Sequence, residues 1–208
     1  MTMWPEGPAG PRSGSEWADV VRARLFEQRT ILLGGELTDI AASEAGAELM
    51  TLDALGDTRV TVQLDVTGGG LEAAFSVMDV IDLLGVPVDV LCVGRAEGPG
   101  VGILAVGARR VMAPHARVRL ADPTASASGR ASELGAWAEQ HRAQLDRFHR
   151  RVAEAVHRPA DVVAADCARG RYLTAEEALH YGLVDEVASP RGVIRPHRPR
   201  SIGFPDAI

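Results

Sequence analysis

The fold of this chain is decided by residues Val90–Pro114, which read VLCVGRAEGPGVGILAVGARRVMAP. The apolar run Val88–Val93 predicts a buried strand, Gly94–Gly100 a tight glycine-rich turn, and Val101–Ala108 a short apolar helix that leads into a second strand. A strand that turns sharply into a helix directs backbone N–H groups and the positive end of the helix dipole at one point, which suits an oxyanion or a phosphate. Serine hydrolases commonly present their nucleophile on such a turn. Here the tip reads Glu97-Gly98-Pro99 and contains no Ser, Cys or Thr, so the sequence predicts the turn without its nucleophile.

Strands and helices are predicted to alternate on both sides of this stretch. Before it, the strands Thr30–Leu33 and Arg59–Val66 are followed by the helices Thr38–Leu55 and Leu71–Leu84, with Thr38 as an N-cap. The second strand of the stretch is expected at Val111–Met112, and two further strands are expected after it, at Arg117–Leu120 and Val184–Val187. Such alternation implies parallel βαβ crossovers, and therefore an α/β domain.

Three helices are predicted in the second half of the chain. A long helix, Glu133–His157, carries charges on most of its faces, so we expect it to protrude from the core or to pair with a partner. A short helix at Pro159–Ala165 follows. Thr174 and Glu177 form a capping box for a last helix, which Gly182 closes.

Composition and charge exclude several classes of protein. The 208 residues suffice for one domain with a sizeable core, and the net charge of −6 argues against a nucleic-acid-binding surface. No apolar run is long enough to span a membrane and no leader pattern is visible at the start, so we expect a cytoplasmic protein. Two cysteines are too few for a disulfide framework, and Cys92, in an apolar strand, is expected to be an inert buried thiol.

Metal and cofactor sites are not expected from the local patterns. His141 and His149 lie eight residues apart on the long helix, more than two turns, and no H-x-x-x-H or C-x-x-C spacing occurs. The run Gly68-Gly69-Gly70 follows a strand but lacks the spacing and the lysine of phosphate-binding loops, so a tight structural turn is the favoured interpretation. Glu97 and Asp122 near strand ends are either a carboxylate pair for acid–base chemistry or, as we favour, solvated charges paired with Arg95 or Arg119.

An ordered set of motifs carries a resemblance to a known family. They are Arg29–Glu36 (RTILLGGE), Asp65–Gly70 (DVTGGG), Cys92–Gly100, Pro114–Val118 and Tyr172–Asp185 (YLTAEEALHYGLVD). From roughly Leu25 to Ala188 the chain resembles the ClpP family, the proteolytic subunit of the Clp protease. The resemblance implies a ClpP/crotonase-like α/β domain of repeated β-β-α units wound into a superhelix. It divides the chain into a flexible arm (1–16), a domain (17–188) with a protruding helix at 133–157, and an irregular Arg/Pro-rich tail (189–208).

The departures from the family pattern bear on function. The resemblance aligns the family's catalytic Ser, His and Asp with Gly98, Ala121 and Gly170, and none of these side chains can attack, accept a proton or orient a base. It places one oxyanion-hole donor at Gly68 or Gly69 and the other at the residue after the nucleophile. That residue is Pro99, which has no N–H. The resemblance therefore implies a pseudo-protease.

The resemblance also bears on partners. The family's Asp-Arg-Asp run between stacked rings reads Ala168-Arg169-Gly170 here, so Arg169 is the expected oligomer contact. The aromatic pocket for the unfoldase ATPase matches Gln63, Met78 and Val111, which argues against ATPase docking. We therefore expect a ring-shaped oligomer of this chain alone or with an active ClpP paralogue.

Two alternatives remain open. One is a crotonase-type acyl-CoA enzyme that uses Glu97 and Asp122. The other is a scaffold that binds a protein partner through its arm or its tail.

Overall fold

The computed structural model describes residues 14–189 and shows one mixed α/β unit built on a seven-stranded sheet. Five strands follow the order β1-β2-β3-β4-β7 and are parallel, as the βαβ alternation predicts. The C-terminal end of β3, Arg95–Glu97, pairs in parallel with β5. Strand β5 also pairs with β6, which runs antiparallel to it. The elements are α1 (Gly14–Glu27), β1 (Thr30–Leu37), α2 (Asp39–Ala54), β2 (Val60–Gly69), α3 (Leu71–Leu83), β3 (Val88–Glu97), α4 (Pro99–Ala105), β4 (Arg109–Met112), β5 (Arg117–Leu120), α5 (Ala131–Val156), α6 (Ala160–Ala168), β6 (Arg171–Thr174), α7 (Ala175–Tyr181) and β7 (Glu186–Val187).

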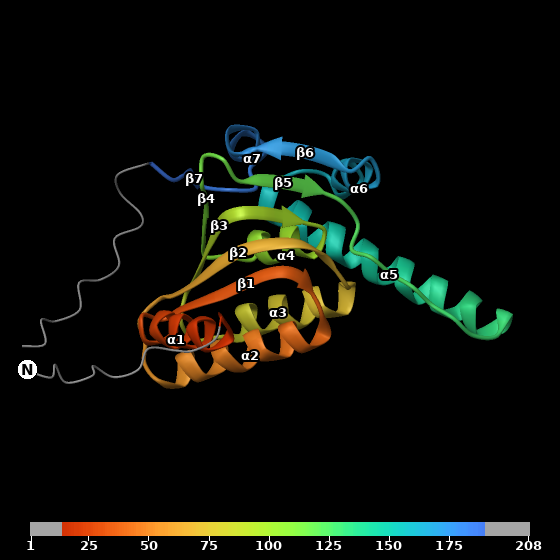
Figure 1. Ribbon diagram of the computed structural model, residues 1–208. Coiled ribbons are helices and arrows are strands. Elements are labelled where there is room, and N and C mark those ends of the chain that lie inside the picture. The colour runs from red at the N-terminus through yellow and green to blue at the C-terminus, as the bar shows by residue number, and fades with distance from the viewer. Residues whose placement is uncertain (1–13, 190–208) are drawn as a thin grey trace, which may run out of the picture.

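The core lies between the sheet and the helices α2, α3 and α4, which pack side by side against it (Figure 1). Alternate residues of β2 are completely buried: Val60, Val62, Leu64 and Val66. Val, Leu and Ala dominate this core, and their small, stiff side chains suit a sheet that is covered by helices.

Local capping signals mark the helix ends that the sequence predicts. The Thr38 side chain accepts a hydrogen bond from the N–H of Ala41 at 3.2 Å, which confirms this N-cap. The Thr174–Glu177 capping box is also present, since each side chain accepts from the other residue's N–H, and Gly182 closes α7 with φ +89°.

The strands are longer than the glycine positions suggest. β1 continues through Gly34-Gly35 to Leu37, and β2 continues to Gly69, because Leu37 and Gly69 still pair in the parallel ladder. β3 likewise runs to Glu97, so the expected turn of seven residues shrinks to Gly98 alone and α4 begins directly at Pro99. Ladder hydrogen bonds between strands distant in sequence override the turn preference of glycine here.

Other boundaries differ by a few residues. Helix α6 is displaced along the chain from the predicted Pro159–Ala165, and β7 has two residues instead of four. Helix α3 ends at Leu83, with Leu84 rather than Gly85 as its C-cap.

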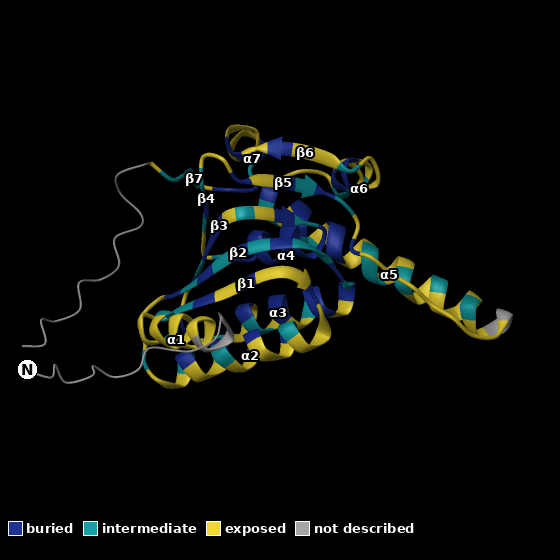
Figure 2. Ribbon diagram, in the orientation of Figure 1, coloured by how far each residue is buried: buried dark blue, intermediate teal, exposed yellow. Residues whose placement is uncertain are grey.

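Helix α5 confirms the long helix predicted at Glu133–His157, and its two halves differ in environment. Its second half buries Phe148, Val152 and Val156, whereas no side chain described before Phe148 is buried, and Trp137 remains 37% exposed. In Figure 1 the first half extends away from the sheet, and Figure 2 colours it exposed or intermediate. The helix ends at His157 in the left-handed conformation, with φ +53°.

The ends of the chain modify the expected domain limits. Gly14–Glu16 form the first turn of α1, so the arm expected at residues 1–16 is three residues too long. The rest of the arm, and the tail from residue 190, lie outside the described residues. Within residues 14–189, none of the helices combines the length and the apolar character that a membrane crossing requires.

Candidate active-site region

The junction between β3 and α4 has the backbone geometry that presents a nucleophile. Gly98 adopts φ +52° and ψ −111°, a conformation that L side chains adopt with strain and that a nucleophile elbow requires. A Cβ built on Gly98 would meet the Asp122 carbonyl oxygen and Pro123 Cα at 3.7 Å, which is ordinary van der Waals contact. The position therefore has room for a side chain, and glycine leaves it without a nucleophilic atom.

Strand pairing brings the three family triad positions together. In the antiparallel β5–β6 ladder Leu120 pairs with Arg171, so Ala121 and Gly170 face each other just beyond the ladder. The Ala121 carbonyl oxygen lies 3.8 Å from the position that a Gly98 Cβ would take. Gly98, Ala121 and Gly170, which the resemblance aligns with the family's triad, thus lie in one region, and their side chains supply no group for acyl transfer.

The donors expected for an oxyanion hole are altered. Pro99 is the first residue of α4 and has no N–H to donate. The N–H of Gly98 donates to the Arg119 carbonyl at 3.4 Å, and that of Val101 donates to the Gly98 carbonyl at 3.1 Å. At the start of α4, the N–H groups of Gly98 and Val101 are therefore already hydrogen-bonded, and Pro99 has no N–H group.

Gly68 and Gly69 lie at the end of strand β2 and not in a turn, which corrects the sequence expectation. Val66 of β2 pairs with Ala96 of β3, so Gly68 and Gly98 each follow this pair by two residues along neighbouring parallel strands. Gly69 has φ +136°, and a Cβ there would come within 2.3 Å of the Leu37 carbonyl oxygen, so another residue would displace backbone. The role that the structure gives Gly69 is close strand packing.

The neighbourhood of Gly70 does not fit a phosphate. The N–H of Gly70 donates to the Leu37 carbonyl. The adjoining cavity of about 450 Å³ is lined by the carboxylates of Asp39 and Glu72, which repel anions. This finding supports the preference for a structural role of the glycine run.

The guanidinium of Arg119 occupies the space beside Gly170. Its Nη1 lies 3.8 Å from Oε2 of Glu97, and its carbon lies 5.4 Å from the centroid of the Tyr172 ring. A Cβ on Gly170 would lie 3.4 Å from Arg119 Nη2. A cation therefore stands beside the position that the resemblance aligns with the family's Asp.

Glu97 and Asp122 are held by separate partners. Glu97 pairs with Arg119, as the favoured interpretation predicts, whereas Arg95 pairs with Asp65 at 3.1 Å. Asp122 bonds to Nε2 of His149 at 2.7 Å, and this partner was not predicted. The structure gives these two carboxylates no shared hydrogen bond or ion pair.

Arg169, the expected oligomer contact, has a partner within its own chain. Its Nη2 donates to the buried carboxylate of Asp166 at 2.6 Å, and the same carboxylate accepts from Arg171 and from the hydroxyl of Tyr181 at 3.0 Å. Burial alone would raise the pKa of Asp166, but the hydrogen bonds from Arg169 and Tyr181 and the charge of Arg171 lower that pKa below its usual value. Burial and the same carboxylate raise the pKa of Tyr181 to about 12.

Both cysteines are buried, and their surroundings differ. Burial raises the pKa of the Cys92 thiol to about 12, which confirms the prediction of an inert thiol. Burial and the charges of Asp122 and Asp166 raise the pKa of Cys167 to about 12 as well. Cys167 lies beside Asp122 and His149, and the ligand atoms of these three residues lie within 4.8 Å of one another. Spacing within one motif cannot reveal this group, because its members come from three distant segments.

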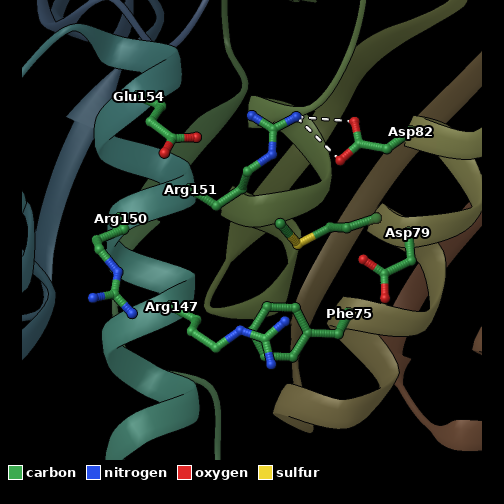
Figure 3. Close-up of a pocket in the computed structure, with 8 residues that line it drawn as sticks. Phe75, Asp79, Asp82, Arg147, Arg150, Arg151 and Glu154 are labelled. Carbon is green, nitrogen blue, oxygen red and sulfur yellow. Dashed lines mark hydrogen bonds and ion pairs between the residues drawn. The ribbon is translucent and has the colours of Figure 1, made fainter.

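A second hollow lies between α3 and α5, on the side of α3 that carries Met78 (Figure 3). This cavity of about 220 Å³ is lined by charged side chains of both helices around Phe75. Arg151 donates to both oxygens of Asp82, at 2.9 and 3.2 Å, and the guanidinium of Arg147 stacks on Phe75. Met78 itself is 2% exposed, so it offers almost no apolar surface to a partner.

The fold and the junction together define a mixed α/β protein with a mostly parallel sheet, a protruding helix and a nucleophile-type turn. The family model of the Clp protease matches residues 12–191, and this chain belongs to the Clp protease (ClpP) family.

The curated relatives agree with this assignment. The chain is 34% identical over 189 residues to the ATP-dependent Clp protease proteolytic subunit 3 of Rhodococcus jostii, covering 87% of this chain and 91% of the relative. It is 33% identical to proteolytic subunit 1 of Corynebacterium glutamicum (83% and 85% covered) and 30% identical to proteolytic subunit 1 of Gloeobacter violaceus (88% and 94% covered).

Proposed function

We propose that this chain is a ClpP-family subunit without peptidase activity, which acts as a structural or regulatory member of a ring-shaped assembly. One observation carries the proposal. The strand-to-helix junction keeps the strained backbone that presents a nucleophile, and the residue there is Gly98.

The chemistry of acyl transfer supports inactivity at three points. Gly98 has no atom that can attack a carbonyl, Ala121 has none that can take up a proton, and beside Gly170 stands the cation of Arg119. Pro99 removes one backbone donor, and loss of a single oxyanion-hole donor typically costs about 10²–10³ in rate even when the nucleophile is present.

Peptidase inactivity is tested with the full chain and a fluorogenic peptide together with an activated ester. We expect no turnover above buffer in the fractions that contain the protein. Turnover that follows the protein through size exclusion and changes on Arg119→Gln would contradict the proposal, because this substitution alters the candidate site and not a contaminating protease. Arg24→Ala, on the exposed face of α1, is the matched control.

The assembly part of the proposal rests on family membership and on α5. The first half of this helix projects from the body, and its residues from Glu133 onward are exposed or intermediate, including Trp137. We propose that this half of α5 contacts other subunits. The domain (17–188) then has the ClpP/crotonase-like superhelical fold, and the assembly acts in the cytoplasm. Arg169 is 70% exposed despite its bond to Asp166, which leaves the guanidinium accessible to a neighbouring subunit.

The mass in solution tests assembly, first for the chain alone and then for its mixture with an active ClpP paralogue from the same cell. A large homo-oligomer supports a self-contained ring, and entry into large particles only in the mixture supports a mixed ring. A monomer in both conditions would contradict the assembly proposal. Arg169→Ala is expected to shift the mass downward, whereas Arg24→Ala should leave it unchanged.

Docking of an ATPase on this subunit is not part of the proposal. At two of the three positions that the resemblance assigns to the docking pocket, Met78 and Val111, the side chains are almost completely buried, and Gln63 is polar. Among the described residues no observation favours the acyl-CoA alternative, because Glu97 pairs with Arg119 whereas Asp122 hydrogen-bonds to His149. Most of the arm and most of the tail, on which the scaffold alternative depends, lie outside the described residues.

A further inference from the structure

Three side chains with different metal-ligand atoms meet one residue away from the family's catalytic His position. Asp122 directly follows Ala121, His149 lies in the buried half of α5, and Cys167 lies in the last turn of α6. Their carboxylate oxygen, imidazole nitrogen and thiol sulfur all lie within 4.8 Å of one another. Because the three residues come from separate elements, their convergence is a product of the tertiary fold.

The three ligand atoms would have to shift by up to roughly 1 Å to reach the separations of a tetrahedral zinc site. Zn–N and Zn–O bonds of about 2.0–2.1 Å and a Zn–S bond of about 2.3 Å place neighbouring ligand atoms roughly 3.3–3.6 Å apart. Nε2 of His149 and Oδ1 of Asp122 are 2.7 Å apart, so they would need to separate by roughly 0.6 Å. Asp122 can make this adjustment, because its side chain is 37% exposed and lies outside the strands.

The donor set selects the kind of ion. Ca²⁺ and Mg²⁺ prefer oxygen ligands, whereas one thiolate, one imidazole and one carboxylate suit Zn²⁺. Three protein ligands leave a fourth tetrahedral position for water. We propose that Asp122, His149 and Cys167 bind one Zn²⁺ ion at this position in the fold.

The charges around the cluster favour a cation. The carboxylate of Asp122 contributes a negative charge to the cluster, whereas that of the buried Asp166 already bonds to Arg169 and Arg171. A divalent ion offsets this negative charge. On binding, the S–H bond of Cys167 breaks and its proton leaves to solvent, the sulfur bonds to zinc, and His149 binds as the neutral imidazole.

A route to the cluster is present on its α5–α6 side. His149 lines an open cavity of about 220 Å³ between these helices, together with Asp146, Arg150, Ala160, Asp161 and Ala164. The carboxylates of Asp146 and Asp161 attract a cation at this entrance, where Arg150 is the opposing charge.

Bound zinc would join three parts of the molecule. It would connect the segment after β5 to α5 and α6, and so hold the root of the protruding helix against the junction region. A ligand that binds the folded chain alone, at a concentration 100-fold above its Kd, raises Tm by roughly 5–10 °C for a chain of this size.

The test uses the full chain without an affinity tag, reduced and treated with a chelator. Zn²⁺ is titrated in competition with a chromogenic chelator. We expect one ion per chain, a rise in Tm, and at least a tenfold loss of affinity in Cys167→Ala and in His149→Gln. The matched controls are Cys92→Ala, which removes the other buried thiol, and His141→Gln, which changes another histidine of α5; both should bind like the wild type.

Co²⁺ in place of Zn²⁺ reports the sulfur ligand directly. The wild-type chain and Cys92→Ala should show a thiolate-to-cobalt charge-transfer absorption, and Cys167→Ala should not. If the buried variants fail to fold, two measurements still test the proposal: the cobalt absorption of the wild-type chain, and the zinc affinity of Asp122→Asn, which changes an exposed residue. Absence of stoichiometric binding to the wild type, or equal binding by both cysteine variants, would overturn the proposal and leave a hydrogen-bonded His–Asp pair beside a buried thiol. Neither result depends on whether the chain hydrolyses peptides.

Discussion

Rebuilding the family's triad in this chain should give only slow hydrolysis unless Pro99 is also replaced. The perturbation is the triple substitution Gly98→Ser, Ala121→His and Gly170→Asp, made once with Pro99 retained and once with Pro99→Ala. The backbone of β3, α4, β5 and β6 already brings the three positions together, so both variants carry a nucleophile, a base and a carboxylate at neighbouring sites.

The structure sets the expected magnitudes. Ser at Gly98 must adopt φ +52° and ψ −111°, which costs about 1–3 kcal/mol of the free energy of unfolding, although the Cβ itself has room. With Pro99 in place, the residue after the new Ser donates no hydrogen bond to the tetrahedral intermediate. Pro99→Ala restores that N–H, and one such donor contributes about 10²–10³ in rate.

Arg119 is a second obstacle for the rebuilt triad. A carboxylate at position 170 would stand beside its guanidinium, because the Cβ position there is 3.4 Å from Nη2. The new Asp would then bond to Arg119 and not to the imidazole at 121. Adding Arg119→Gln should therefore increase the rate further.

The assay is hydrolysis of an activated ester, with labelling by a fluorophosphonate probe to count reactive serines and a Tm measurement to confirm folding. We expect the rate to rise by about two to three orders of magnitude when Pro99→Ala is added to the triple variant. If the two variants hydrolyse the ester equally while both are labelled, the argument about the lost donor is wrong. If neither folded variant is labelled, Gly98 is not at a nucleophile position.

Three further outcomes are expected from the packing. Tyr181→Phe removes the hydroxyl that donates to buried Asp166 and should lower the free energy of unfolding by about 1.5–3 kcal/mol in urea titrations; an unchanged value would show that the bond contributes nothing. The pKa of Asp166 is lowered in the folded state, so its contribution to the free energy of unfolding should be complete above its ordinary pKa of about 4. This contribution should be lost as the pH falls through the folded-state pKa. Asp166→Asn should therefore flatten the acid side of a plot of unfolding free energy against pH. Gly102→Ala would bring a Cβ within 2.5 Å of the Phe148 ring and should lower the free energy of unfolding by about 1–3 kcal/mol. A Cβ at Gly135, in the exposed half of α5, would have nothing within 4 Å, so Gly135→Ala should raise the free energy of unfolding by about 0.5–1 kcal/mol. Equal changes in Tm for the two variants would contradict this account of the packing.

Helix limits were the most predictable part of the fold. The helices at 38–55, 71–84 and 133–157 appear within a few residues of their expected limits, because caps and hydrophobic period are local properties of the chain. The strand ends were predicted less well. The first strand was expected to end at Leu33, and Gly68-Gly69 were expected to form a turn. Both glycine pairs lie in strands, because each is held by hydrogen bonds to a strand that is distant in sequence.

The positions of the candidate site were predictable from the sequence, whereas the partners of its side chains were not. Alignment of motifs was enough to assign Gly98, Ala121 and Gly170 to one region, and the structure brings them together through the β3–β5–β6 ladders. The partners of the charged residues could not be predicted. Arg119 beside Gly170, and His149 with Asp122 and Cys167, depend on how α5 and α6 lie against the end of β5.

By itself, the sequence determined the α/β class, the family and the absence of a nucleophile at the junction, since each of these follows from which residue types occur in which order. The tertiary structure decided which side chains meet. It extended the strands through their glycines, tied Arg169 to a buried Asp166 and assembled an Asp-His-Cys cluster from three distant segments. The physical reason is that periodicity and capping act over one or two turns of chain, whereas ion pairs and metal-ligand groups depend on contacts that form only when separate elements pack.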